Sequence, residues 1–150
     1  MTLDDIGRDP RDIELNQSLP ALSLRLNKEM FGAGGVRTIH NDDEAARREG
    51  LPGAIAVGPQ VASLIFRMMH GAFGPGWIGA GGTALTFRRP ISSDGFVTAG
   101  GRVVGKRLEG GSVRVECEVW VDTLEGVRAV VGTASALVPR ETPDADQRRA

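Results

Sequence analysis

The chain has 150 residues, 41% of them hydrophobic and 25% charged, which is typical of one globular domain with a sizeable core. Its net charge of -1 gives no overall attraction to nucleic acid or to an acidic membrane surface, so we expect a small-molecule partner, no nucleic acid and no membrane. The single cysteine, Cys117, excludes an internal disulfide and a cysteine-based zinc site.

The two ends of the chain differ in composition from the middle. Residues 1–12 carry acids instead of the basic stretch and apolar run of a secretory signal, and we expect them to be flexible. Residues 13–139 are expected to form the domain, and the polar residues 140–150 a disordered tail. No apolar run approaches ~18 residues, so the sequence predicts a cytoplasmic protein.

The first predicted elements are a strand and a short helix. Leu22, Leu24 and Leu26 alternate with polar residues, which is the period of a half-buried strand. Residues 41–50 predict a helix, with Asn41 as its N-cap in a capping box and with acids before arginines along it.

Residues 58–74 predict a long central helix, which opens with Gly58 and with Pro59 at the first helical position. Its apolar residues cover most of the circumference, so we expect burial on nearly every side. These residues are Val61, Ala62, Leu64, Ile65, Met68, Met69 and Ala72.

From Trp77 onward the sequence predicts four consecutive strands within residues 78–91, 96–108, 112–122 and 127–139, joined by short turns as an antiparallel meander. The economical arrangement is an α+β fold, a single hot-dog domain in which a curved antiparallel sheet wraps around one long central helix.

The segment "IHNDDEAARREGLPGAIAVG" resembles the MaoC-like, or (R)-specific enoyl-CoA hydratase, family of hot-dog proteins. The family's histidine, aspartate and paired small residues are matched by His40, Asp42, Ala45 and Ala46. Its approach to the central helix is matched by Ile55, Ala56 and Gly58, and its third-strand pattern by Phe87, Pro90 and Asp94. The likeness covers roughly residues 15–139.

The resemblance implies a hydratase or dehydratase of acyl thioesters, with coenzyme A or phosphopantetheine present only as part of the substrate and with no metal or other cofactor. His40 would be the base, because the positive end of the helix after it favours a neutral ring. The backbone N–H of Gly58 would bind the thioester oxygen, and Asp42 would orient or assist His40. The family likeness also implies a homodimer with the pocket between protomers, or a hetero-oligomer with another hot-dog chain.

The sequence departs from the family at decisive positions. The catalytic aspartate that family hydratases carry five residues before the histidine is replaced by Gly35, and Arg37 and Thr38 replace the asparagine and proline between them. Val57 replaces the histidine that precedes Gly58. The catalytic dyad is therefore incomplete.

Val57 and three arginines are candidates for substrate binding. Arg37 has the chemistry to pair with a substrate carboxylate or phosphate, and as a solvated side chain it needs no such role. Arg88 and Arg89, predicted on opposite faces of a strand, offer one charge to the phosphates of a coenzyme A or carrier-protein arm, or form an ordinary exposed pair.

Ordinary structural roles are alternatives to a function for the other candidate residues. Asp42 suits helix capping, Gly58 suits turn geometry, and His70 suits a hydrogen-bonded position near the end of the buried helix. Two further functions stay open. One is a diverged hot-dog thioesterase, isomerase or cyclase, for instance in secondary metabolism, that uses His40 and Arg37. The other is a non-catalytic acyl-binding subunit that needs a complete partner chain.

Overall fold

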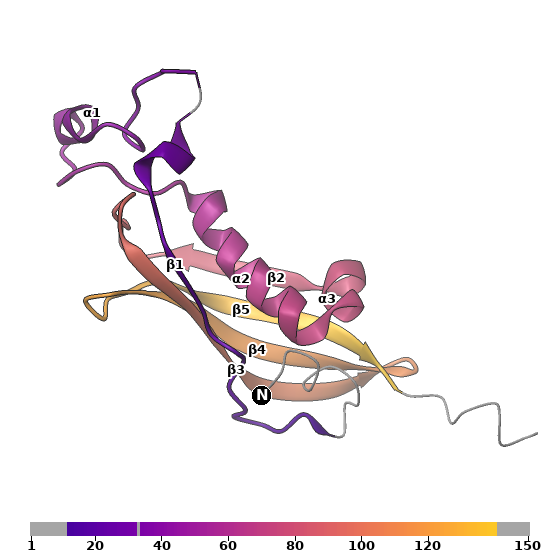
Figure 1. Ribbon diagram of the computed structural model, residues 1–150. Helices are drawn as coiled ribbons and strands as arrows, with labels where there is room; N and C mark the ends of the chain where they lie inside the picture. The colour runs from indigo at the N-terminus through magenta and orange to yellow at the C-terminus, as the bar shows by residue number, and fades with distance from the viewer. Residues whose placement is uncertain (1–11, 33, 141–150) are drawn as a thin grey trace, which may run out of the picture.

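The computed structural model describes residues 12–32 and 34–140, and it contains one sheet, three α-helices and a short 3-10 helix (Figure 1). Apart from Asp12 and Arg140, the predicted flexible start (1–12) and disordered tail (140–150) lie outside the described residues. No helix in the described ranges has both the length and the apolar character that crossing a membrane requires.

The sheet has five strands in the order β1-β3-β4-β5-β2, and every neighbouring pair is antiparallel. The strands, in chain order, are β1 (Leu22–Arg25), β2 (Gly82–Phe87), β3 (Phe96–Glu109), β4 (Ser112–Thr123) and β5 (Arg128–Pro139). The α+β class predicted from the sequence is confirmed.

The predicted four-strand meander is wrong in one connection. β2 pairs with β5, with Leu85 opposite Gly132, and only β3, β4 and β5 follow one another as hairpin neighbours. A side chain at Gly132 would overlap the carbonyl oxygen of Ala84, so the glycine permits this close pairing. Residues 88–95 then carry the chain from the β2 edge toward the opposite side of the sheet.

The long helix α2 (Gly58–Phe73) runs along the sheet (Figure 1). It begins one residue before Pro59. One face packs into the core through its buried residues, which are Val61, Ala62, Leu64, Ile65, Met68, Met69, Ala72 and Phe73. The expectation of burial on nearly every side is wrong, because Ser63, Arg67 and His70 are exposed on the other face. The helix is amphipathic rather than enclosed.

A short helix that the sequence reading placed in a strand follows α2. Gly74 has a positive φ of 52° and reverses the chain, and Pro75 then opens α3 (Pro75–Ala80). Trp77 therefore lies on a helix, and its ring packs 5.9 Å from the ring of Phe66 on α2, measured between centroids.

The remaining elements lie beyond the end of the sheet, near the start of α2 (Figure 1). They are the 3-10 helix η2 (Lys28–Phe31) and α1 (Asp43–Arg48). We call residues 36–57, which include α1 and lead into α2, the α1 segment. Backbone hydrogen bonds join it to the turn before β3, among them the bond from the N–H of Ala56 to the oxygen of Ile91 (2.8 Å).

Candidate active site

The ring of His40 is fixed in a half-buried position at the start of the α1 segment. Its Nδ1 lies 2.8 Å from the carbonyl oxygen of Ile55, and the N–H of Ile55 donates to the oxygen of Ile39 at 2.9 Å. A carbonyl oxygen only accepts, so Nδ1 carries the hydrogen of this bond. In a neutral ring Nε2 then keeps its lone pair, which is the arrangement required of a base.

Asp42 is the N-cap of α1. Its Oδ1 accepts the N–H of Ala45 at 2.8 Å, and its Oδ2 lies 3.6 Å from Nε of Arg37. The predicted cap Asn41 is wrong: its side chain instead accepts the N–H of Thr38 and donates to the oxygen of Val36. Within the described residues, no hydrogen bond joins Asp42 to His40, so the carboxylate is engaged in capping.

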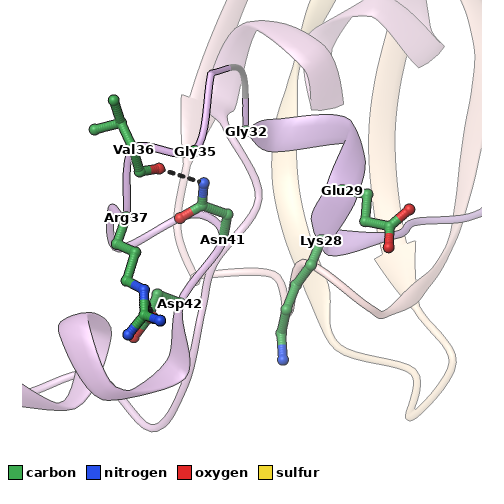
Figure 2. A pocket seen from close by; sticks show the side chains of 8 residues that line it. All are labelled: Lys28, Glu29, Gly32, Gly35, Val36, Arg37, Asn41 and Asp42. Atoms are coloured by element: carbon green, nitrogen blue, oxygen red, sulfur yellow. Dashed lines mark hydrogen bonds and ion pairs between the residues drawn. The ribbon is translucent and has the colours of Figure 1, made fainter.

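A surface pocket of about 400 Å³ opens beside Asp42 (Figure 2). Its lining residues are Lys28, Glu29, Gly32, Gly35, Val36, Arg37, Asn41 and Asp42. In Figure 2 the guanidinium of Arg37 stands next to Asp42, whereas the Glu29 side chain points away from it. The Arg37 side chain is 81% exposed.

Gly58 and Val57 form the N-terminal end of α2. Val57 is the N-cap, and its oxygen accepts the N–H of Val61 at 3.1 Å. Among the described residues, no acceptor bonds the N–H of Gly58, and Pro59 has no N–H to offer. One donor is therefore available at this helix end.

The sequence reading did not place Phe87 in the site, although the residue belongs to the family pattern. A Cβ built on Gly58 lies 3.5 Å from Cε1 of Phe87, so the ring borders the backbone of this glycine. Half of the Phe87 residue is exposed. The ring is therefore an apolar neighbour of Gly58.

Arg88 and Arg89 do not lie on a strand, and that prediction is wrong. β2 ends at Phe87, and the N–H groups of both arginines donate to the oxygen of Ala129, at 2.8 and 3.2 Å. Pro90 follows and has no N–H with which to continue the pairing. Both arginine side chains are exposed.

A cluster around Lys28 was missed by sequence reasoning. The Nζ of Lys28 lies 2.6 Å from Oδ2 of Asp43 and 3.2 Å from Oδ2 of Asp94. The N–H of Ala54, and after it Lys28, lowers the pKa of Asp43, and the two carboxylates raise the pKa of Lys28. These residues are far apart in sequence and match no motif, so only the fold reveals them.

Other chemical groups contribute little to the site. The thiol of Cys117 is buried, and burial raises its pKa to about 12, so it is not a nucleophile near neutral pH. In the part of the chain that the structure describes, no three histidine, cysteine or acidic residues gather into a metal-binding group.

Neither the protein-family models nor the curated proteins contain a match to this chain. Solved structures do match it. The chain resembles a MaoC-like dehydratase from Rhodospirillum rubrum with 21% identity and a TM-score of 0.74, over 91% of this chain and 100% of that one. It also resembles an (R)-hydratase from A. caviae involved in PHA biosynthesis, with 25% identity and a TM-score of 0.68, over 85% and 98%.

A third similar structure is the ChsH1-ChsH2 complex from Mycobacterium tuberculosis, with 18% identity and a TM-score of 0.64. The match covers 85% of this chain and 98% of that one. The resemblance inferred from the sequence is thereby confirmed, and the chain has the hot-dog fold of the MaoC-like dehydratases and (R)-hydratases.

Proposed function

We propose that the chain is a hydratase or dehydratase of enoyl or hydroxyacyl thioesters carried by coenzyme A or a carrier protein, with His40 as its base. The observation that carries the proposal is the hydrogen bond from Nδ1 of His40 to the oxygen of Ile55, which fixes the ring and leaves Nε2 as an acceptor. The similar hydratases and dehydratases supply the reaction class.

In the hydration direction, Nε2 takes one proton from water as the water oxygen bonds to the β carbon of the enoyl thioester. The double-bond electrons move toward the thioester oxygen, where the N–H of Gly58 stabilises the developing negative charge. The imidazolium then gives its proton to the α carbon. One histidine thus serves as base and then as acid, and the atoms of water are all accounted for.

The missing acid has a kinetic consequence. A separate general acid or base contributes on the order of 100-fold to 10,000-fold. Gly35 replaces the acid, so His40 acts alone. The chain is therefore expected to turn over more slowly than a hydratase with a complete catalytic dyad. Asp42 does not compensate, because its carboxylate caps α1.

The arginines provide a contact for the coenzyme A or carrier-protein arm. Arg88 and Arg89 follow Phe87 directly, and the Phe87 ring borders Gly58, so their exposed charges lie at the same end of the molecule as the proposed oxyanion donor. A guanidinium there suits the phosphates of coenzyme A or phosphopantetheine. Arg37, paired with Asp42 at the pocket, suits an acidic group of the substrate.

The proposal includes a homodimer, with a hetero-oligomer as its alternative. β2 is an edge strand with five of its six residues exposed, so its outer backbone groups are free to pair with another chain. A similar structure is a complex of two different chains, which favours the hetero-oligomer as the second candidate. In that case this chain supplies binding and its partner supplies the missing acid.

The test is to incubate the purified chain with a panel of trans-2-enoyl-CoA thioesters and to measure hydroxyacyl product and free thiol. We expect hydration that His40→Ala abolishes and that His70→Ala leaves unchanged, because His70 is exposed at the far end of α2. Release of thiol without hydration would point to a diverged thioesterase. Folded protein with no turnover would reject the stand-alone hydratase and favour the partner-dependent subunit.

A further inference from the structure

We propose that Lys28 is a positioning residue for His40, acting through Asp43 and the loop that holds the imidazole. The inference rests on the proposed function for the meaning of the ring's placement, but the placement itself is measurable without any substrate. Neither Lys28 nor Asp43 touches the reacting atoms in the proposed mechanism.

Lys28 joins three separate parts of the chain. It lies on η2, its Nζ reaches Asp43 on α1 at 2.6 Å, and it reaches Asp94 in the turn before β3 at 3.2 Å. Its backbone N–H also donates to Oδ1 of Asp94 at 3.0 Å. The turn before β3 is continuous with the sheet, so Lys28 connects α1 to the sheet.

Asp43 connects Lys28 to the loop that holds the ring of His40. Its Oδ2 binds Lys28, while its Oδ1 accepts the N–H of Ala54 at 2.8 Å. The next residue, Ile55, accepts the Nδ1 hydrogen of His40. The relay therefore runs from Lys28 through Asp43, Ala54 and Ile55 to the imidazole, with hydrogen bonds of ordinary length throughout.

The α1 helix contributes little to the hydrophobic core. It has six residues, and Ala46 is its one buried residue. A helix this short is not stable by itself in water, so tertiary contacts must place it. The Lys28 and Asp43 side chains are 31% and 39% exposed, which is more protected than an ordinary surface ion pair.

A second ion pair on the same helix provides a matched control. Arg48 binds Glu44 at 2.6 Å, the same N to O distance as in the Lys28 and Asp43 pair. Both residues belong to α1, and their side chains are 72% and 70% exposed. This pair therefore stabilises the helix locally, and among the described residues neither side chain bonds another element.

The experiment compares Lys28→Met with Arg48→Met in the full chain at neutral pH. The first readout is the nitrogen NMR spectrum of the imidazole, which distinguishes the two tautomers. The chain has two histidines, and His40→Ala assigns the signals. The second is hydrogen exchange at the N–H of Ala54 and of Ile55.

For Lys28→Met we expect a mixture of His40 tautomers and roughly threefold to tenfold faster exchange at Ala54 and Ile55, with strands β3 to β5 unchanged. For Arg48→Met we expect the wild-type tautomer and exchange rates. Where turnover is measurable, kcat should fall about 10-fold in Lys28→Met, because the ring is displaced.

A wild-type tautomer and unchanged local exchange in Lys28→Met would overturn the inference. Equal acceleration over the whole sheet would also overturn it, because it would show a general stability role. If Lys28→Met does not fold, Asp43→Asn decides, since the amide still accepts the N–H of Ala54 but loses the ion pair. Absence of turnover in the wild type would reject the proposed function and leave the tautomer and exchange results decisive for Lys28.

Discussion

At the scale of single residues, a substitution of Gly58 tests its proposed role as oxyanion donor without disturbing the fold. Its φ lies outside the left-handed region, and a Cβ there would meet Phe87 at 3.5 Å, an ordinary contact. Gly58→Ala should therefore fold with unchanged or slightly higher stability, since alanine favours a helix over glycine by up to about 1 kcal/mol.

The same methyl group would stand beside the N–H that is proposed to bind the thioester oxygen. We expect kcat/KM for enoyl thioester hydration to fall by about 10-fold to 100-fold, which is within the range for loss of one oxyanion donor. Thermal unfolding and initial-rate kinetics on the same preparation check both halves. Unchanged kinetics in a stable variant would remove Gly58 from the mechanism.

Two substitutions of Asp42 distinguish its role in helix capping from a role in the reaction. Its Oδ1 accepts the N–H of Ala45, a bond that an asparagine also makes. We predict that Asp42→Asn keeps both stability and turnover, whereas Asp42→Ala loses about 1 kcal/mol of unfolding free energy. Urea unfolding and hydration rates of the two variants test this. A large loss of turnover in the asparagine variant alone would show that the carboxylate charge takes part in the reaction.

At this scale the sequence predicted where residues lie along the elements better than it predicted their contacts. His40 precedes α1 and Gly58 begins α2, as predicted, but the N-cap of α1 is Asp42 and not Asn41, because the asparagine side chain bonds the preceding turn. Gly35 has a φ of 74°, where an aspartate would be strained. The loop backbone therefore differs from one that would hold an acid at that position, which no pattern of residue types reveals.

At the scale of elements, Arg114 fastens α3 to the sheet. Its guanidinium binds both carboxylate oxygens of Glu109, at 2.8 and 2.9 Å, and also donates to the oxygen of Ala80 at the end of α3. The Arg114 side chain is only 14% exposed. Because α3 has no buried residue of its own, this contact at its C-terminal end helps to hold it in place.

We predict that Arg114→Met lowers the unfolding free energy by about 1.5–3 kcal/mol, the range for hydrogen bonds to charged groups. The matched control is Arg107→Met. Arg107 also lies near Glu109, at 3.8 Å, but its side chain is 61% exposed, so its loss should cost at most about 1 kcal/mol. Equal losses in the two variants, measured by urea unfolding, would contradict a clamp at Arg114.

The sequence predicted most elements well and their neighbours less well. The apolar period fixed α2 to within one residue, and the alternation found β1, β3, β4 and β5. It did not predict α3, because a six-residue helix between glycines has too few residues to show a period. Nor did it predict that β2 pairs with β5, since that depends on the close approach permitted at Gly132.

At the scale of the whole molecule, two ion-paired carboxylates link stability to pH. The N–H of Ala54 and then Lys28 lower the pKa of Asp43 below its ordinary 3.8, and Arg114 lowers that of Glu109 below its ordinary 4.5. The unfolded chain therefore binds these protons more readily than the folded chain. Their stabilising contribution is complete above the ordinary values and is lost as the pH falls through the lowered ones.

We predict a flat urea midpoint from about pH 8 down to about pH 5 and a decline below that, as other carboxylates also protonate. Asp43→Asn should show a smaller decline than the wild type, because it no longer has this linked group. The raised pKa of Lys28 acts in the opposite direction: its contribution holds below 10.5 and is lost only as the pH rises beyond that value. An identical acid profile in Asp43→Asn would contradict the assignment.

The sequence predicted the hot-dog architecture from one apolar central helix and a set of alternating strands, and solved structures confirm it. The site did not follow as completely. The bond between His40 and Ile55 and the relay through Lys28 join residues up to 66 positions apart, as between Lys28 and Asp94. Such contacts depend on tertiary placement, which periodicity and short motifs do not encode.

The most direct test of the proposed chemistry is the initial rate of water addition to a short trans-2-enoyl-CoA by the purified wild type, His40→Ala and His70→Ala. We predict measurable hydration in the wild type and in His70→Ala, with a fall of at least about 100-fold in His40→Ala. Equal rates in the wild type and His40→Ala, or no rate in any folded preparation, would contradict a stand-alone hydratase that uses His40 as its base.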